Sequence, residues 1–477
     1  MNKNALRKLL LTQAVIVLGW MVVGSPPAQA QFQYGPPTNP IPEPTPKPRP
    51  DLDPRFDILL RGKTWSPLPV DPFQTPLERM AAVDTEFKQR FGLTGLEPEN
   101  NLSLAEIQNV LKQAEERGRG RTALIYWWLR DGNLTVAMVL PKGVAEQTTF
   151  LSTVSMNARE VQQTISQFIN AIQDPRQRAT THYRVPGQKL YQWLIAPLEP
   201  ILDKHQVQTL LLVPDEHFRG LPYRALWTGN EHLVERYRLS QIPSINLVNL
   251  DLTSKGIYGQ TVVMGSEDFG GRQPQLPAAR IEVNQIAEIT RGQKHLNQDF
   301  TASNFLTAWQ RHAGFAFHVA THAEFLPTRS YIEFYDQPLE LSALQRQLRA
   351  NPSELVVLSA CRTAIGDVNA ELGFAGLAVR LGAKRVVASL WRVEDEPTLA
   401  LMNDFYRRLR ANGENLPHSE ALRQAQIAML RGDLRVQDGQ LVAANYTVPL
   451  ATTHRSSNPN FTHPYYWAAF NMIGNPW

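Results

Sequence analysis

The spacing of apolar residues changes near residue 260, and the change predicts two differently built regions. Upstream, Ser103-Leu104-Ala105-Glu106 has the pattern of a helix-capping box and leads into apolar residues at helical spacing. Two apolar runs at 122–129 and 134–140 flank Asp131-Gly132, a dipeptide that favours the tight turn of a β-hairpin. The same rules predict further elements in this region: helices at 161–172 and 190–202, and a strand at 209–213.

From about residue 260 the pattern alternates between short apolar runs and helical periods. It predicts strands at 261–264, 315–319, 355–359 and 385–390, and helices at 278–289, 303–310, 374–381, 398–410 and 419–430. Strands that alternate with helices predict an α/β fold with a largely parallel sheet covered on both faces. The chain has no self-similarity at a 34-residue period, so nothing in it indicates a helical repeat array.

The first thirty residues have the features of a secretory signal peptide. Lys3, Arg7 and Lys8 precede an apolar stretch at 9–24, and Ala28-Gln29-Ala30 is a small-x-small cleavage site. The stretch is shorter than the roughly 20 apolar residues of a membrane span, so an uncleaved anchor is the lesser alternative. We therefore expect an exported protein, periplasmic or extracellular, with no transmembrane span after cleavage.

Residues 31–55 are rich in proline, with nine prolines from Pro36 to Pro54. Proline fixes φ and removes an amide donor, so this segment predicts an extended linker between the envelope and the folded part. A docking motif for an envelope protein partner is the alternative. Folded sequence is expected to begin near residue 56, with a helical region at 56–120.

Charge and cysteine content narrow the classes further. Removing the three cations of the signal peptide leaves 45 Lys and Arg against 44 Asp and Glu, a net charge of +1. Global charge therefore gives no support for a nucleic-acid partner. The chain has one cysteine, which cannot form an internal disulfide, so stability is expected to come from apolar burial.

That single cysteine, Cys361, follows the predicted strand at 355–359, and His322 follows the strand at 315–320. Catalytic groups collect beyond the carboxyl ends of strands in open α/β sheets. A free thiol has a pKa of about 8.5, and a nearby imidazole can take its proton and activate it. The alternative is a Cys361 that packs in the sheet and a His322 whose ring is satisfied by loop carbonyls.

His318 and His322 are four residues apart, which raises the question of a metal site. Four residues of strand span about 13 Å, so both rings could not bind one ion without a turn between them. We expect no metal and no cofactor, with His318 packed in the strand. The chain has no GxxxxGKS/T, no GxGxxG after a strand and no GxSxG, so nucleotide enzymes and serine hydrolases have no local support.

Several motifs, in order, resemble those of one family. The stretches His318-Val319-Ala320-Thr321-His322-Ala323-Glu324-Phe325 and Leu358-Ser359-Ala360-Cys361-Arg362-Thr363-Ala364-Ile365-Gly366-Asp367 resemble the two signature motifs of CHAT domains, caspase-like cysteine peptidases related to separase. The likeness covers roughly residues 120–477 and continues through 212–215, 221–226, 233–237, 376–378, 382–391 and 463–470.

The resemblance implies a caspase-like fold, a mostly parallel sheet with helices on both faces. It implies a smaller, degenerate caspase-like half at 121–255 and a catalytic half at 256–477. His322 would be the general base and acid, and Cys361 the nucleophile that forms a thioester with a protein or peptide substrate. The backbone amides of Ala323 and Cys361 would hold the oxyanion.

One departure from the family pattern concerns activity. The family usually has Gly after the histidine, whereas this chain has Ala323. A Cβ could crowd the acyl group, and a positive φ would strain an alanine. The alternative function is therefore a catalytically silent CHAT module that acts as a protein-interaction domain in the cell envelope. A different thiol enzyme, such as an amidase or transpeptidase, is a third.

The segment after the strand at 385–390 lines the specificity pocket in related peptidases. Here it contains Trp391, Arg392 and Asp395. Asp395 matches by position an acid of separase that faces a basic residue, which implies a preference for Arg or Lys. Arg392 after Trp391 resembles instead the caspase arrangement that receives an acidic residue. The alternative to both is an exposed helix N-terminus whose acids at 394–396 complement the helix dipole.

Overall fold

The computed structural model describes residues 102–145, 149–253, 256–325, 330–348, 352–359, 362–363, 382–412, 416–450 and 460–477. The predicted signal peptide, the proline-rich linker, most of the predicted region at 56–120 and the predicted helix at 374–381 lie outside these residues. Within them, every helix is too short or too polar to cross a bilayer.

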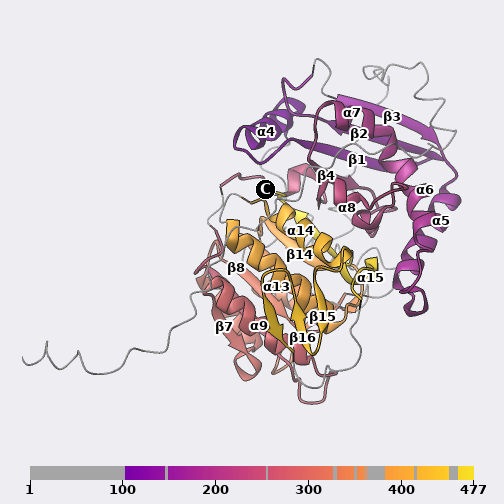
Figure 1. Ribbon diagram of the computed structural model, residues 1–477. Coiled ribbons are helices and arrows are strands. Elements are labelled where there is room, and N and C mark those ends of the chain that lie inside the picture. The colour runs from indigo at the N-terminus through magenta and orange to yellow at the C-terminus, as the bar shows by residue number, and fades with distance from the viewer. Residues whose placement is uncertain are drawn as a thin grey trace, which may run out of the picture. The chain divides into compact units, whose positions relative to one another are not determined.

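The described strands include eleven that form one sheet, in the order β3-β2-β1-β4-β5-β18-β14-β12-β8-β6-β7 (Figure 1). Their bounds are β1 Thr122–Arg130, β2 Asn133–Val139, β3 Thr149–Ser155, β4 Thr209–Pro214, β5 Arg238–Gln241, β6 Thr261–Gly265, β7 Gln293–Leu296, β8 Ala316–Ala320, β12 Leu355–Ser359, β14 Arg385–Ser389 and β18 Phe470–Gly474. The strands predicted from the sequence are all present, within one or two residues.

The sheet consists of two parallel groups that run in opposite directions. The first strand group is β1, β4 and β5, extended by the antiparallel β2 and β3. The second strand group is β7, β6, β8, β12 and β14. Strand β18 joins them, since it is antiparallel to β14 and parallel to β5. The carboxyl ends of the two groups therefore lie at opposite edges of the sheet.

Local sequence accounts for the ends of several elements. Asp131 and Gly132 both have positive φ, 52° and 72°, as a two-residue hairpin turn between β1 and β2 requires. The capping box at Ser103 and Glu106 is formed, and it begins α4, Leu104–Glu116. These parts of the prediction are confirmed.

The single helix predicted at 190–202 is wrong. The chain forms α6, Arg184–Leu194, then a short 3-10 turn, Ala196–Leu198, and then α7, Glu199–Lys204. Pro197 has no N–H to donate and its ring crowds the preceding turn, so a continuous helix cannot pass through it. Apolar spacing alone did not reveal this break.

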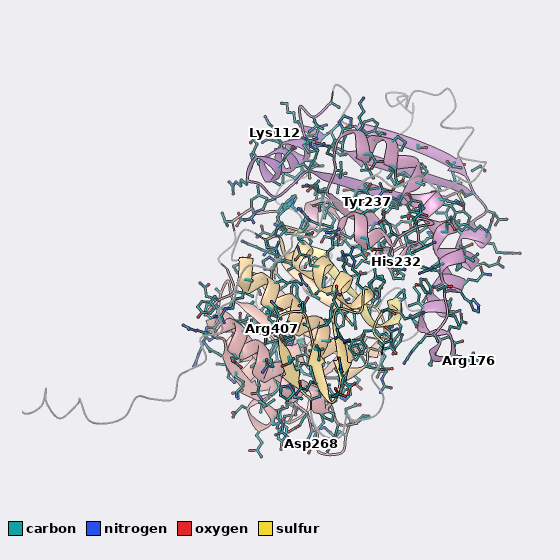
Figure 2. The ribbon with its side chains drawn as sticks, viewed as in Figure 1. Lys112, Arg176, His232, Tyr237, Asp268 and Arg407 are labelled. Carbon is teal, nitrogen blue, oxygen red and sulfur yellow. The ribbon has the colours of Figure 1, made fainter. Side chains whose placement is uncertain are left out.

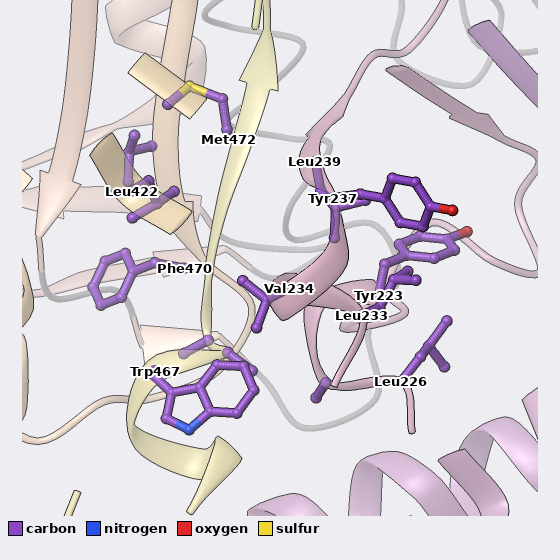
Figure 3. Packing of buried hydrophobic residues seen from close by; sticks show 14 of the residues in the cluster. Tyr223, Leu226, Leu233, Val234, Tyr237, Leu239, Leu422, Trp467, Phe470 and Met472 are labelled. Atoms are coloured by element: carbon purple, nitrogen blue, oxygen red, sulfur yellow. The ribbon is translucent and has the colours of Figure 1, made fainter. Parts of the chain in front are cut away.

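The remaining helices cover the sheet on both faces. They are α5 Ala158–Gln173, α8 Leu233–Arg236, α9 Pro277–Thr290, α10 Ala302–Arg311, α11 Leu341–Gln347, α13 Asp395–Asn412, α14 His418–Leu430 and α15 Pro464–Trp467. Figure 1 shows α13 and α14 in front of β8 and β14. One core cluster extends along that face from the first strand group to the second, through side chains such as Leu239, Phe470 and Met472 (Figure 3).

The opposite face holds two separate core clusters. Alternate residues of β1, such as Leu124 and Tyr126, pack with α4, and alternate residues of β8 and β12, such as Phe317 and Val356, pack with α10. The second strand group is thus covered on both faces, as its apolar runs predicted. This confirms an α/β fold with a mostly parallel sheet.

Two smaller sheets complete the described strands. One has the order β11-β10-β9-β13 and the other β15-β16-β17. Their bounds are β9 Ala323–Phe325, β10 Ser330–Glu333, β11 Pro338–Glu340, β13 Arg362–Thr363, β15 Arg435–Gln437, β16 Gln440–Val442 and β17 Thr447–Pro449. The first of these sheets lies just beyond the carboxyl ends of β8 and β12 in sequence, where both predicted catalytic residues occur.

Candidate active site

His322 lies between two pairs of aligned strands. Before it, β8 runs parallel to β12, with Ala320 opposite Ser359. After it, β9 runs parallel to β13, with Glu324 opposite Arg362. The backbone of 320–324 is therefore paired, on both sides of His322, with the backbone that flanks residues 360 and 361. Parallel pairing of two successive strands explains why this histidine is placed at the sheet edge.

The predicted nucleophile, Cys361, lies outside the described residues. The chain is described up to Ser359 and again from Arg362, so two residues connect β12 to β13. The Cys361–His322 dyad accordingly stays a prediction. What the structure establishes is that the strands on either side of Cys361 pair with the strands on either side of His322.

The imidazole of His322 is held by the loop that follows β6. Its Nε2 lies 2.8 Å from the carbonyl oxygen of Pro274, a loop carbonyl of the kind that the non-catalytic alternative also expected. A carbonyl can only accept, so Nε2 carries the hydrogen and donates it. In the neutral ring, Nδ1 is then the basic nitrogen. The buried ring of Phe269, from the same loop, packs beside the imidazole with centroids 5.2 Å apart.

The backbone at His322 is tied to β10. The amide of Glu333 donates to the His322 carbonyl at 2.9 Å, and the Thr321 hydroxyl donates to the Glu333 carbonyl. The C=O and N–H of a trans peptide point in opposite directions, so the N–H of Ala323 points away from β10. Since β9 lies between β10 and β13, this amide is directed to the β13 side.

Ala323 itself is not strained. It lies in β9, an extended strand, and it is absent from the described residues with positive φ. Its side chain is 1% exposed and belongs to the core cluster between the second strand group and α10. The methyl group that distinguishes this chain from the family's usual glycine is thus accommodated in the core.

His318 is packed inside β8, as predicted. Its ring is fully buried, and its Nε2 lies 2.9 Å from Oε1 of Glu282, a buried residue of α9. The ring of Tyr406, from α13, meets it edge-on with centroids 5.4 Å apart. Among the described residues no group of three His, Cys, Asp or Glu side chains could hold a metal ion.

The three predicted specificity residues differ in exposure. Trp391 is 3% exposed, and its indole N–H donates to the Tyr465 carbonyl at 3.0 Å, so its side chain belongs to the core. Arg392 is exposed, and its carbonyl accepts from the Tyr465 hydroxyl at 3.1 Å. Their roles in specificity stay predictions.

Asp395 is the first residue of α13 and is half-buried. Burial, together with the nearby Glu282 carboxylate, raises its pKa to about 7, although the backbone amide of Ala278 donates to it. Ala278 is four residues beyond Pro274, so Asp395 contacts the segment that leads from the His322 loop into α9. The neighbouring Glu394 pairs with Arg178. Glu394 is exposed, as the helix-start alternative expects, whereas Asp395 is half-buried.

Sequence reasoning missed the groups that hold His322 and His318. Pro274, Phe269 and Glu282 come from a loop and a helix 36 or more positions away in the chain. The only sequence signal was the position of the loop, directly after the carboxyl end of a parallel strand, where functional groups collect. No fixed spacing links these residues to His322.

Comparisons with known proteins place the chain within a family. A family model described as "CHAT domain" matches residues 184–475, more than half of the chain. No curated protein matches.

Solved structures that resemble the chain include two kinds of protein. The separase–securin complex of Saccharomyces cerevisiae matches with 12% identity and a TM-score of 0.43, over 77% of this chain and 31% of that one. Gingipain R, described as an Arg-specific cysteine proteinase, matches with 12% identity and a TM-score of 0.39, over 67% and 75%. The complex of Porphyromonas gingivalis RgpB pro- and mature domains gives the same identity and TM-score, over 67% and 76%. At these TM-scores the likenesses define neither the site nor the activity of this chain.

Proposed function

This chain belongs to the CHAT domain family, and we propose that it is an exported, caspase-like cysteine endopeptidase in which Cys361 and His322 form the catalytic dyad. The dyad works without a metal or a cofactor, on a protein or peptide substrate. The smaller region at 121–255 is proposed to be a degenerate caspase-like half and the region at 256–477 the catalytic half.

The observation that carries the proposal is the environment of His322. Its Nε2 donates to the Pro274 carbonyl, which leaves Nδ1 as the ring nitrogen that takes up a proton. A general base needs this fixed tautomer, because the nitrogen that faces the nucleophile must carry the lone pair. The pairing of β12 and β13 with β8 and β9 supports a nucleophile from the connecting residues.

The proposed chemistry proceeds in two stages. His322 takes the proton of the Cys361 thiol, and the thiolate attacks the scissile carbonyl carbon to form a C–S bond. The imidazolium then protonates the leaving amine as the C–N bond breaks, which gives a thioester. In the second stage His322 removes a proton from water, the hydroxide attacks the thioester, and the acid product leaves as the thiol is reprotonated.

The Ala323 amide supports a role in oxyanion binding. It points to the β13 side of β9, the side on which the chain enters β13 from Cys361. One such donor is typically worth about 3–4 kcal/mol in the transition state. The extended backbone at Ala323 removes the strain argument that favoured a catalytically silent module acting through an envelope protein partner.

Substrate preference is proposed from Asp395 and Arg392. Because burial and the Glu282 carboxylate raise the pKa of Asp395 to about 7, the negative fraction of its carboxyl increases as the pH rises through 7. If Asp395 reads an Arg or Lys before the scissile bond, kcat/KM for such peptides should rise with pH through 7. A preference for acidic residues that does not change across this range would instead indicate Arg392.

The experiment that tests the activity uses the full chain and its Cys361→Ala variant. Iodoacetamide reports on Cys361 alone, since it is the only cysteine. We expect alkylation with a midpoint well below the ordinary thiol pKa of about 8.5, and cleavage of a peptide library that the variant does not perform. Full cleavage by the variant would remove the proposal.

The same measurements separate the alternative. A silent CHAT module predicts an ordinary thiol midpoint and no turnover of any peptide, so one robust substrate eliminates it. Export is tested by N-terminal sequencing of the secreted chain. Cleavage after Ala30 predicts a mature protein that begins at Gln31.

A further inference from the structure

The loop that holds His322 is itself fastened to the strand that holds the His322 backbone. Residues 266–276 connect β6 to α9 and contain Pro274, the acceptor of the His322 hydrogen bond. Two residues before it, Arg272 reaches across to β10. Its Nε donates to Oε1 of Glu333 at 2.9 Å.

The guanidinium makes two further contacts with the same strand end. Its Nη2 donates to the Phe334 carbonyl at 3.1 Å and to the Tyr335 carbonyl at 2.7 Å. The Glu333 carboxylate is 2% exposed, so it is a buried charge whose pairing with Arg272 matters more than that of a surface pair. One side chain therefore fixes the loop at three points, one in β10 and two in the residues that follow it.

These contacts close a ring around the base. His322 donates to Pro274, Pro274 is linked by Gln273 to Arg272, and Arg272 binds Glu333. Glu333 donates its amide to the His322 carbonyl at 2.9 Å. Every link is a hydrogen bond or a stretch of at most three residues, so a shift of the loop moves the Pro274 carbonyl relative to the imidazole.

We infer that Arg272 is a positioning residue for His322: through Glu333 and the loop it holds the Pro274 carbonyl in place, and so fixes the tautomer and ring orientation of the base. This rests on the proposed function. Arg272 takes no part in the chemistry. Its loss should allow the imidazole to turn, so that Nδ1 no longer meets the thiol in the productive geometry.

The test compares Arg272→Ala with wild type in the full chain. We expect kcat to fall by about tenfold to a hundredfold with KM within about twofold, because the base and not substrate binding is disturbed. The pH midpoint of iodoacetamide alkylation should rise toward that of an ordinary thiol. Arg272→Lys should restore activity in part, since an ammonium can pair with Glu333 but cannot make all three contacts.

Arg280→Ala is the matched control. Arg280, in α9, pairs with Glu267 of this loop at 2.8 Å, and the arginine side chain is exposed. The Arg280→Ala variant should have the alkylation midpoint and kcat of wild type. If circular dichroism shows that Arg272→Ala does not fold, Arg272→Lys and Glu333→Gln replace it in the test. For each of them we expect an alkylation midpoint between that of wild type and that of an ordinary thiol.

The outcomes separate the inference from the proposed function. A lowered wild-type midpoint that Arg272→Ala, Arg272→Lys and Glu333→Gln all preserve overturns the positioning role and leaves the dyad intact. An equal loss in Arg280→Ala also overturns it, because a general effect of the loop would then suffice. An ordinary thiol midpoint in wild type overturns the proposed function itself, and the inference with it.

Discussion

In each strand group, a hydrogen-bonded histidine follows the carboxyl end of one parallel strand. The two histidines differ in the group to which the imidazole is hydrogen-bonded. In the first group, His217 follows β4, and its Nδ1 lies 3.3 Å from Oδ2 of Asp215. That carboxylate is buried and also accepts from the amides of Leu129 and His217. In the second group, His322 follows β8 and donates to a neutral carbonyl, that of Pro274.

The partner decides what each imidazole can do. The hydrogen bond to Asp215 raises the pKa of His217 and favours its charged form. A carbonyl carries no charge, so it orients the ring of His322 while the ring keeps a basic nitrogen. A position beyond a strand end is therefore not sufficient to predict a catalytic base. The contacts made from other segments matter.

The largest expected effect tests this comparison directly. His322→Gln should lower kcat/KM for a cleaved peptide by about a hundredfold to ten-thousandfold, the usual contribution of a general base. His217→Gln should change it by less than about twofold, since only local structure is affected. Steady-state kinetics on both variants decide the matter. A comparable loss in His217→Gln would mean that the first strand group takes part in activity.

The next prediction compares ion pairs in the two groups by chemical denaturation. Glu354 and Arg385 pair with 1% and 2% of their side chains exposed, and Lys384 is also 3.3 Å from Glu354. Lys384 keeps Asp251 at 3.1 Å, but Glu354→Leu leaves Arg385 buried without its paired carboxylate and should reduce the free energy of unfolding by about 3–5 kcal/mol.

Among the helices beside the first strand group, the matched variant is Glu199→Leu in α7. Its partner Arg236 is 20% exposed and keeps a second acid, Asp203, at 3.1 Å. The expected loss is about 1 kcal/mol. Both glutamates are buried, so equal losses in the two variants would show that the exposure of the remaining arginine and its second acid do not reduce the loss of unfolding free energy.

A third prediction concerns the place where the two groups meet. His232 of the first region, labelled in Figure 2, lies with its ring 5.3 Å from Trp467 of α15. His463, which precedes α15, meets Tyr183 edge-on at 5.1 Å. Burial, with Arg178 and His232 nearby, lowers the pKa of His463 to about 4.

The direction of the pH effect on stability follows from proton uptake by His463. The unfolded chain protonates His463 near pH 6.5, whereas the folded chain does so only near pH 4, so stability is lost as pH falls between these values. The pKa difference corresponds to a loss of about 3 kcal/mol. His463→Asn keeps an acceptor for the Tyr465 amide and should reduce the acid loss of unfolding free energy. The exposed His182→Gln is the control, and parallel profiles for wild type and His463→Asn would contradict the prediction.

The smallest effect is expected at Asp395. Its folded pKa of about 7 exceeds the ordinary 3.8, so the folded chain holds an extra proton between these values and stability falls as pH rises. Asp395→Asn can still accept from Ala278 and should be more stable than wild type at pH 8 by about 1 kcal/mol or less, because the side chain is partly exposed and solvent screens the carboxylate. At pH 3 wild type and Asp395→Asn should have the same melting temperature. A stability difference between them that stays constant from pH 3 to 8 would contradict this prediction.

Much of the second strand group could be predicted from sequence. Strand β12 was predicted with its observed bounds, and α9, α10, α13 and α14 within three residues, because apolar periodicity is strong where both faces of a sheet are covered. Strands β5, β7 and β18 were not predicted. They are short and gain their place from pairing with distant strands, and β5 meets β18 through the single aligned pair Gln241 and Ile473.

The site followed the same division. His322 and its place after a strand could be predicted, and the family motif identified its role. Pro274, Arg272 and Glu333 could not, because each acts through a contact across 11 to 61 positions of chain and none belongs to a recognisable motif. Whether Ala323 is strained could also not be predicted from the sequence, since only the backbone conformation distinguishes a strained alanine from an extended one.

The sequence by itself determined the α/β class, the succession of the main strands along the chain, the two strand-end motifs and the family. These depend on local periodicity and on short motifs that each carry their own signal. The tertiary structure decided the opposite directions of the two strand groups, the buried partner of His318 and the carbonyl that sets the tautomer of His322. Those depend on which distant segments meet once the sheet has formed, and hydrogen bonds and burial act on distance in space and not on distance along the chain.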